Sequence, residues 1–244
     1  MNVLIAIDDT DNEESIGTGR LARMLADELV KEKLLQAPSV TRHQFLVHPD
    51  IPYTSHNSCA CVGARQAAGV NLRMTINYAV DFLDRNFHEG ADPGLCIANE
   101  EEVPRELVDF GLRAQREVIQ PDEARLLAER LEIFTWCRGE PWRGAIGAMG
   151  GVGLRSTGCD GRFIGLEGIR EISGIMNVKE LLSRTGIQKV AAASGTSLRD
   201  DDIIDTRDWV RPVLQNHEII LFVDRTSDGM WRPIGGKKKD KKKK

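Results

Sequence analysis

The sequence has few aromatic residues, no long apolar run and no paired cysteine motif, and each absence argues against a class of protein. Aromatic side chains make up 5% of the 244 residues, so aliphatic side chains must fill most of the core. No apolar run approaches the ~20 residues that a membrane-spanning helix needs. The first apolar segment, residues 3–7, is too short for a signal peptide and lacks its basic start. We therefore expect a soluble, cytoplasmic protein.

The cysteines form no recognisable framework. Their number is odd and none has CxxC spacing, which argues against a set of disulfides or a zinc knuckle. In a reducing cytosol such residues behave as small buried hydrophobes. The five are Cys59, Cys61, Cys96, Cys137 and Cys159.

Charge is distributed unevenly along the chain. The net charge of -4 includes a tail, residues 237–244, with seven Lys and one Asp. Without that tail, 26 basic and 36 acidic residues remain, a net charge of -10. Nucleic acids and anionic membranes both select basic surfaces, so the acidic body disfavours them as general partners. The remaining composition, 41% hydrophobic and 29% charged, is that of a globular protein with one large or two small domains.

Apolar periodicity predicts strands that alternate with helices. The expected strands are residues 2–8, 40–47, 58–62, 94–98, 187–193 and 218–223, and the expected helices are 18–35, 71–87, 102–131 (broken near Pro121) and 177–185. This order predicts a mixed α/β (α+β) fold with a central sheet and flanking helices. We expect a first domain over 1–154, a C-terminal α+β part over 155–234 and a disordered Lys-rich tail over 235–244. Thr18 is the expected N-cap of the first helix.

An acidic cluster follows the first expected strand. Asp8, Asp9 and Asp11 lie within four residues, where an α/β sheet usually opens its ligand crevice. A divalent cation would relieve the repulsion between these carboxylates, and oxygen ligands on a tight loop suit Mg²⁺. The alternative is that the acids only solvate a loop before a helix, whose positive end favours them.

Two familiar phosphate-handling motifs match poorly. Asp9-Thr10-Asp11 gives the D-x-D of haloacid-dehalogenase phosphatases, but Asn12-Glu13 follows in place of a small residue and Thr or Val. No G-x-x-x-x-G-K-[ST] run is present, so a bound nucleotide would not use a Walker-type loop.

Two further segments carry candidate residues. Residues 49–58 combine two prolines with consecutive polar side chains, including His56, and could hold a polar substrate or only satisfy their own backbone. In residues 143–153, Arg143 precedes closely spaced glycines, which could bind an anion or allow close helix packing. Glycines are so frequent over 144–168 that we expect neither a helix nor a strand throughout.

Several of these residues together resemble a known family. Residues 5–11, I-A-I-D-D-T-D, and then Gly17-Thr18, resemble the G-I-D-D-T-D signature at the start of tRNA(Ile) agmatidine synthetase. Residues 48–58 resemble its N-P-N-I-P-x-K-T-R-G-N-G-A segment. Asp92-Pro93-Gly94 and residues 143–148 fit its later motifs. The resemblance covers about residues 1–155, the kinase domain of that family. The family has a ferredoxin-like domain beside its kinase domain, so the resemblance implies that residues 155–234 could form a ferredoxin-like second part.

The resemblance implies a function and residue roles. The family uses ATP and Mg²⁺ to phosphorylate a wobble cytidine, which agmatine then attacks. By resemblance Asp8, Asp9 and Asp11 are the metal ligands, and Arg143 and the following glycines line the phosphates. We expect the catalytic residues to be Asp9, Thr18, His56 and Arg143, and the nucleotide-binding residues to be Thr10, Thr18, Asn57, Arg143, Gly144 and Gly147. Thr18 corresponds to the family's phosphorylated threonine. Positioning and charge neutralisation, which these groups supply, are the main requirements of phosphoryl transfer.

The departures from the family concern the acceptor. Tyr53 to Ser58 replace K-T-R-G-N-G, so two basic groups are absent. We expect a free-standing relative without the family's OB-fold and zinc-ribbon modules, which acts on a small molecule rather than tRNA. Two alternatives remain: a metal-dependent phosphohydrolase that uses the same acids, and a nucleotide-binding regulatory module without turnover.

Overall fold

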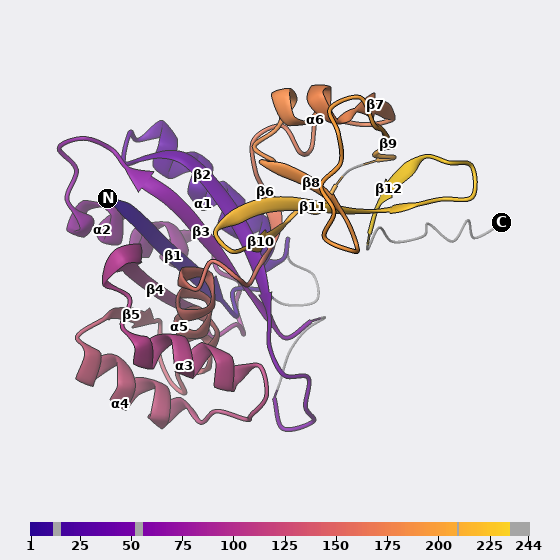
Figure 1. Cartoon of the computed structure of the whole chain (residues 1–244). Coiled ribbons are helices and arrows are strands. Elements are labelled where there is room, and N and C mark those ends of the chain that lie inside the picture. The colour runs from indigo at the N-terminus through magenta and orange to yellow at the C-terminus, as the bar shows by residue number, and fades with distance from the viewer. Residues whose placement is uncertain (12–15, 52–55, 209, 235–244) are drawn as a thin grey trace, which may run out of the picture. The chain divides into compact units, whose positions relative to one another are not determined.

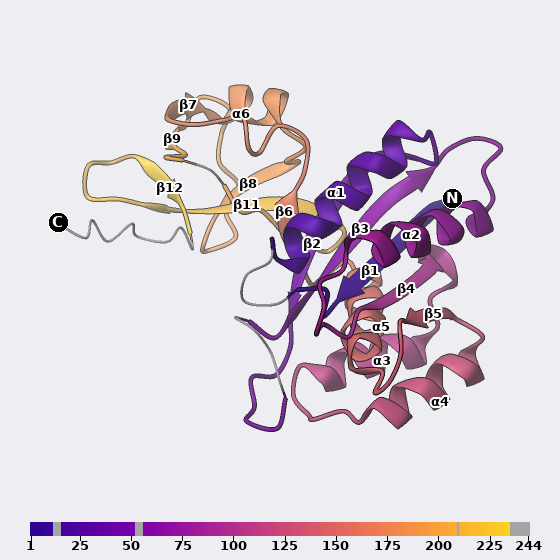
Figure 2. The same ribbon diagram turned by 180° about the vertical axis from the view of Figure 1, so that it is seen from behind.

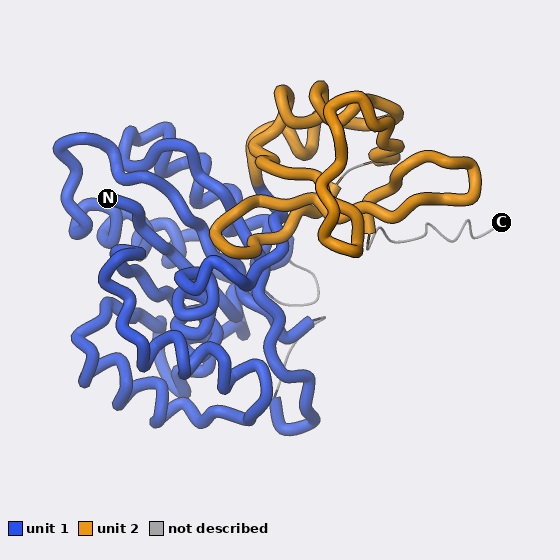
Figure 3. The backbone as a smooth tube through the Cα atoms, viewed as in Figure 1, with its two compact units in different colours: residues 1–165 blue, residues 166–244 orange. Residues whose placement is uncertain are grey.

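The computed structural model describes residues 1–11, 16–51, 56–208 and 210–234. The chain divides into two compact units, Met1–Gly165 (unit 1) and Leu166–Lys244 (unit 2) (Figure 3). Residue 154, where the sequence analysis placed the end of the first domain, lies inside a helix of unit 1. The expected disordered tail, residues 235–244, lies outside the described residues.

Unit 1 contains an antiparallel sheet with the first strand near its centre (Figure 1). Its strands are β1 (Asn2–Asp8), β2 (Leu35–Gln44), β3 (Ser58–Gln66), β4 (Gly94–Asn99), β5 (Phe134–Cys137) and β6 (Arg162–Gly165). Its helices are α1 (Thr18–Lys31), α2 (Leu72–Asn86), the short η1 (Glu100–Glu102), α3 (Arg105–Ala114), α4 (Pro121–Leu131) and α5 (Arg143–Ser156). The order across the sheet is β5-β4-β1-β3-β2-β6, and each neighbouring pair is antiparallel.

Helices cover both faces of this sheet, which confirms the expected central sheet with flanking helices (Figure 2). On one face, α1 and α2 pack against the β1 side chains Val3, Ile5 and Ile7. On the other face, α3, α4 and α5 pack against Leu4 and Ala6. Alternate residues of β1 therefore enter two separate cores, as the two-residue period of a strand requires. A strand buried on both faces explains the uninterrupted apolar run at the start of the sequence.

Helix α5 forms the first part of the glycine-rich segment 144–168, and turns and strand β6 form the rest, so neither a helix nor a strand runs throughout. Five residues of α5 are glycines, Gly144, Gly147, Gly150, Gly151 and Gly153, yet the helix runs without a break from Arg143 to Ser156. Close packing explains this result: a Cβ on Gly153 would lie 2.2 Å from the Leu107 carbonyl oxygen of α3, and one on Gly111 would lie 2.7 Å from the Gly150 oxygen. Tertiary contact at these positions outweighs the low helix propensity of glycine.

The N-cap of one helix and the start of one strand also differ from expectation. Helix α1 begins at Thr18, but its N-cap is Gly17, whose φ is 82°, and no side chain caps the helix. The Thr18 hydroxyl is therefore available for another bond, described below. Strand β2 begins five residues earlier than predicted, because Leu35 packs in the core while the exposed Gln36 and Ala37 interrupt the apolar pattern.

A buried polar network fastens β2 to the segment that follows α5. The His43 ring bonds the Thr41 hydroxyl at 2.8 Å and Asp160 at 2.6 Å, and Gln115 donates to the other Asp160 oxygen at 2.9 Å. Burial lowers the pKa of His43, and the bond to His43 helps to lower the pKa of Asp160. His43 is 1% exposed, so we regard this network as structural.

Unit 2 is a smaller α+β unit. Its elements are β7 (Ile175–Asn177), α6 (Val178–Arg184), β8 (Lys189–Ala192), β9 (Ile203–Asp205), β10 (Val213–Gln215), β11 (Glu218–Arg225) and β12 (Trp231–Pro233). Strand β11 pairs with β10 and β12 antiparallel and with β8 parallel. A ferredoxin-like domain has two helices between its strands, whereas the described residues of unit 2 have α6 alone.

The cysteines match the expectation of small buried side chains only in part. All five cysteines are free; Cys59, Cys61 and Cys96 are buried, and Cys159 is exposed. Within the described part of the chain, no helix is long and apolar enough to cross a membrane.

Candidate functional site

One edge of the unit 1 sheet collects most of the predicted site residues. In the antiparallel register, Asp8 at the end of β1 pairs with Gly94 at the start of β4, and Ile7 pairs with Ala60 near the start of β3. Strand β5 ends opposite Gly94 and leads into α5. The ends of β1 and β5 and the starts of β3, β4 and α5 therefore lie together.

The Asp8 side chain lies against the first turns of α5. A Cβ on Gly147 would be 1.6 Å from the Asp8 Oδ2 atom, so only glycine leaves room for this carboxyl group. Burial, and next the charge of Asp9, raise the pKa of Asp8 from 3.8 to about 8. The structure therefore brings Asp8 and Gly147 together, and it holds Asp8 where a bound cation would favour ionisation.

Asp9 has a strained backbone and several charged neighbours. Its φ of 49° lies in the left-handed region, which residues other than glycine seldom adopt, although Asp tolerates it better than most. Burial, and then the charges of Asp92 and Asp11, raise its pKa to about 6, while Arg143 opposes this shift. Backbone strain in a cluster of like charges is typical of functional sites.

A chain of hydroxyl groups links the acid loop to the start of α1. The buried Thr10 hydroxyl donates to the Thr18 oxygen at 3.1 Å, and the Thr18 hydroxyl donates to Asp11 Oδ1 at 2.7 Å. The carboxylate that accepts from Thr18 is thus positioned to take its proton. The loop between these residues, 12–15, lies outside the described residues.

The sequence analysis did not include Asp92 among the site residues. Its Oδ2 accepts the backbone N–H of Arg143 at 2.7 Å, which fixes the first turn of α5, and its charge acts on Asp9. A Cβ on Gly144 would lie 2.1 Å from the Asp92 carbonyl oxygen. The Asp92-Pro93-Gly94 motif was the available signal, but nothing in it predicts the contact with residue 143.

The polar loop before β3 is only partly described. Asn57 donates to the Leu46 carbonyl at 2.6 Å, and its own carbonyl accepts from Phe45 and from the Gln44 side chain. These bonds connect the end of the loop to residues 44–46. His56 is exposed, and its catalytic role, like the nucleotide role of Asn57, stays a prediction. Residues 52–55 lie outside the described residues.

The donor set fits a magnesium ion shared with a phosphate ligand better than a cage of protein ligands. Among the described residues, no three His, Cys, Asp or Glu side chains are grouped as a metal site. Magnesium, however, commonly uses one or two carboxylates, several waters and substrate phosphates. Asp8 and Asp9 are two adjacent carboxyl groups. Burial, and next the charge of Asp9, raise the pKa of Asp8, and a cation would relieve the repulsion between them.

These pKa shifts predict an unusual pH dependence in metal-free buffer. Because the folded pKa of Asp8 exceeds its unfolded value, its contribution to stability is full below about pH 4 and is lost as the pH rises toward 8. We compare the free energy of unfolding of Asp8→Asn with that of the wild type. We expect this difference to favour the variant more at pH 8 than at pH 4, by on the order of a few kcal/mol. Urea unfolding at both pH values, with a chelator present, measures this. Parallel pH profiles would contradict it.

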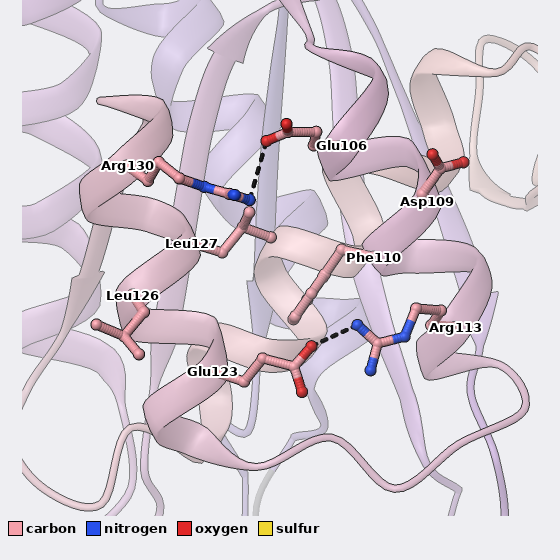
Figure 4. A pocket seen from close by; sticks show the side chains of 8 residues that line it. All are labelled: Glu106, Asp109, Phe110, Arg113, Glu123, Leu126, Leu127 and Arg130. Carbon is pink, nitrogen blue, oxygen red and sulfur yellow. Dashed lines mark hydrogen bonds and ion pairs between the residues drawn. The ribbon is translucent and has the colours of Figure 1, made fainter.

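A separate groove lies between α3 and α4 (Figure 4). It has a volume of about 610 Å³, and Phe110, Leu126 and Leu127 form its apolar part. Ion pairs from Arg130 to Glu106, at 3.0 Å, and from Arg113 to Glu123 connect the two helices across it. None of the predicted site residues lines this groove.

Comparison with known proteins confirms the family resemblance. No family model matches the chain. The 2-agmatinylcytidine synthetase TiaS of Pyrococcus horikoshii, an enzyme named for an isoleucine tRNA, is 30% identical over 159 residues, which are 61% of this chain and 35% of that protein.

Solved structures of TiaS resemble the fold. The complex of TiaS with its isoleucine tRNA and ATP matches 63% of this chain and 36% of its own, with 26% identity and a TM-score of 0.52. The complex with the same tRNA, AMPCPP and agmatine matches 75% and 44%, with 22% identity and a TM-score of 0.53. The chain spans about a third of the length of the curated relative.

Proposed function

We propose that unit 1 is an ATP- and Mg²⁺-dependent phosphotransferase or activating enzyme. The observation that carries this proposal is the hydrogen bond from the Thr18 hydroxyl to Asp11, beside two carboxyl groups whose pKa values are raised. A hydroxyl nucleophile, an adjacent carboxylate base and a pair of acids suited to a cation are the groups that phosphoryl transfer requires. The similarity to TiaS, which was solved with ATP, supports ATP as the donor.

The nucleotide would bind where α5 begins. The backbone N–H groups of a helix N-terminus favour a phosphate, and glycines at 144 and 147 keep side chains away from this end of the helix. The exposed Arg143 side chain would contribute a positive charge to the same phosphates. Asp8 and Asp9 would hold Mg²⁺, which would neutralise charge on the phosphates.

Thr18 would accept the γ-phosphoryl group first. In this step the Thr18 Oγ1 forms a bond to the γ-phosphorus, the bond from that phosphorus to the β,γ-bridging oxygen breaks, and ADP leaves. The hydroxyl proton passes to Asp11, which already accepts it in a 2.7 Å hydrogen bond. Thr10, which donates to the Thr18 oxygen, would keep that oxygen oriented.

A small molecule is the acceptor that the charge balance favours. A net charge of -10 outside residues 237–244 opposes the broad, salt-sensitive attraction that polynucleotides need. The curated relative is named for a tRNA substrate, but this chain matches only 35% of its length.

Mass spectrometry of the protein after incubation with ATP and Mg²⁺ tests this function. We expect phosphothreonine at residue 18 and release of ADP, both lost in Thr18→Val and retained in Thr18→Ser. A phosphoaspartate at Asp8 or Asp9 would instead support a phosphohydrolase. Tight binding of ATP without any product would support a regulatory module, and in either case the proposal would be withdrawn.

A further inference from the structure

Two arginines face each other across neighbouring strands of unit 1. Arg42 of β2 pairs in register with Arg162 of β6, so both side chains project from the same face of the sheet. Burial, and next the charge of Arg162, lower the pKa of Arg42. Like charges directly opposite in a sheet are destabilising. Among the described residues no carboxylate forms an ion pair with either guanidinium, so within this part of the chain the repulsion between the two charges is not compensated.

The arginine pair lies at the same end of the sheet as the acid loop. Arg42 pairs with Ala60, which pairs with Ile7, so the arginines lie level with the end of β1. Adjacent strands are about 4.8 Å apart, which places β2 about 10 Å from β1. Helix α1 covers this face: a Cβ on Gly19 would lie 2.9 Å from the Ile164 side chain of β6. Thr18, the residue before Gly19, is therefore near the same strand as Arg162.

The pair also lies on a different face of the sheet from the α5 turn where the nucleotide would bind. Arg42 projects from the face that carries Val40, Ala60 and Ile7, which α1 and α2 cover. The α5 turn that includes Gly144 and Gly147 belongs to the opposite face. A phosphate bound at the arginine pair would thus approach Thr18 from the side of α1, away from the triphosphate.

We propose that Arg42 and Arg162 bind a phosphate group carried by the acceptor. Guanidinium groups present parallel N–H donors that match phosphate oxygens, and a phosphate dianion would neutralise the repulsion between the two charges. Arg42 is half-buried and Arg162 is exposed, so the pair combines a desolvated donor with access from solvent. The assignment to the acceptor rests on the proposed function; phosphate binding itself does not.

Titration with inorganic phosphate tests the binding site. In a ¹⁵N spectrum of the full chain, we expect phosphate to shift the Nε–Hε signals of Arg42 and Arg162, with an apparent affinity that falls about tenfold or more in Arg42→Gln and in Arg162→Gln. Arg65→Gln is the matched control, because Arg65 is an exposed strand residue at the far end of β3. Unchanged signals in the wild type, or equal losses in Arg65→Gln, would overturn the proposal.

Three further titrations separate the sources of phosphate. Ribose 5-phosphate and a short single-stranded oligoribonucleotide represent a small acceptor and an RNA acceptor; loss of either affinity in both arginine variants supports the site and identifies its source. Calorimetry with ATP and Mg²⁺ should give the same affinity in these variants as in the wild type. An equal loss of ATP affinity would assign the pair to the nucleotide and overturn the acceptor assignment. Wild-type protein that binds phosphate but not ATP would leave the site standing and remove the proposed function.

Discussion

Asp9→Asn is expected to weaken Mg²⁺-dependent binding of ATP by about a hundredfold while the protein remains folded. The substitution keeps the shape of the side chain and removes one negative charge from the cation site, and a charged contact at the upper end of the usual range is worth about 3 kcal/mol. Calorimetric titration with ATP, with and without Mg²⁺, measures the effect. ATP binding without Mg²⁺ should change little, because Asp9 would act on the nucleotide through the cation.

The stability of the same variant provides an internal check. Burial and the charges of Asp92 and Asp11 already penalise an ionised Asp9, so a neutral amide should leave the melting temperature in metal-free buffer equal or higher at pH 8. Asp27→Asn, at an exposed position of α1, is the matched control and should retain full binding. If Asp9→Asn binds Mg²⁺ and ATP as the wild type does, the acid loop is not the metal site.

The position of the acid loop was predictable, although the sheet differs from the one assumed. The sequence analysis placed Asp8 at a ligand crevice by a rule for strands of open α/β sheets. The unit 1 sheet is antiparallel, and its register brings the starts of β3 and β4 to the same edge. A buried strand followed by clustered acids was therefore sufficient to place the acid loop at the end of β1. The strands that lie beside β1 depend on long-range pairing, which this local pattern does not predict.

Two parts of the site depend on contacts that a single sequence does not reveal. Asp92 is 51 residues from Arg143, and it is the pairing of β4 with β5 that brings them within hydrogen-bond distance. Helix α5 was not predicted, because five glycines in 14 residues oppose helix formation locally. The same glycines allow α5 to approach α3 and Asp8, and this close packing is visible only in the folded chain.

Replacing glycines of α5 should separate the contribution of this helix to the site from its contribution to stability. We expect Gly147→Ala to remove most Mg²⁺-dependent ATP binding, because its Cβ would occupy the position of the Asp8 carboxyl, which must then rotate away. We expect Gly153→Ala to lower the free energy of unfolding by about 1–3 kcal/mol, because its Cβ would meet the Leu107 backbone and push α3 from α5. Alanine stabilises a helix by about 1 kcal/mol relative to glycine, so the clash at residue 153 must outweigh this gain for the free energy of unfolding to fall.

Urea unfolding and calorimetry on both variants distinguish these effects. Gly147→Ala displaces a side chain that can rotate, so its unfolding free energy should fall less than that of Gly153→Ala, whose obstacle is backbone. Gly139→Ala is the control, because a Cβ at residue 139 meets nothing within 4 Å and its φ is not positive. Gly147→Ala that binds ATP and Mg²⁺ normally would show that the position of Asp8 against α5 is not needed for the nucleotide. A more stable Gly153→Ala would show that α3 and α5 do not require the close approach that explains this glycine-rich helix.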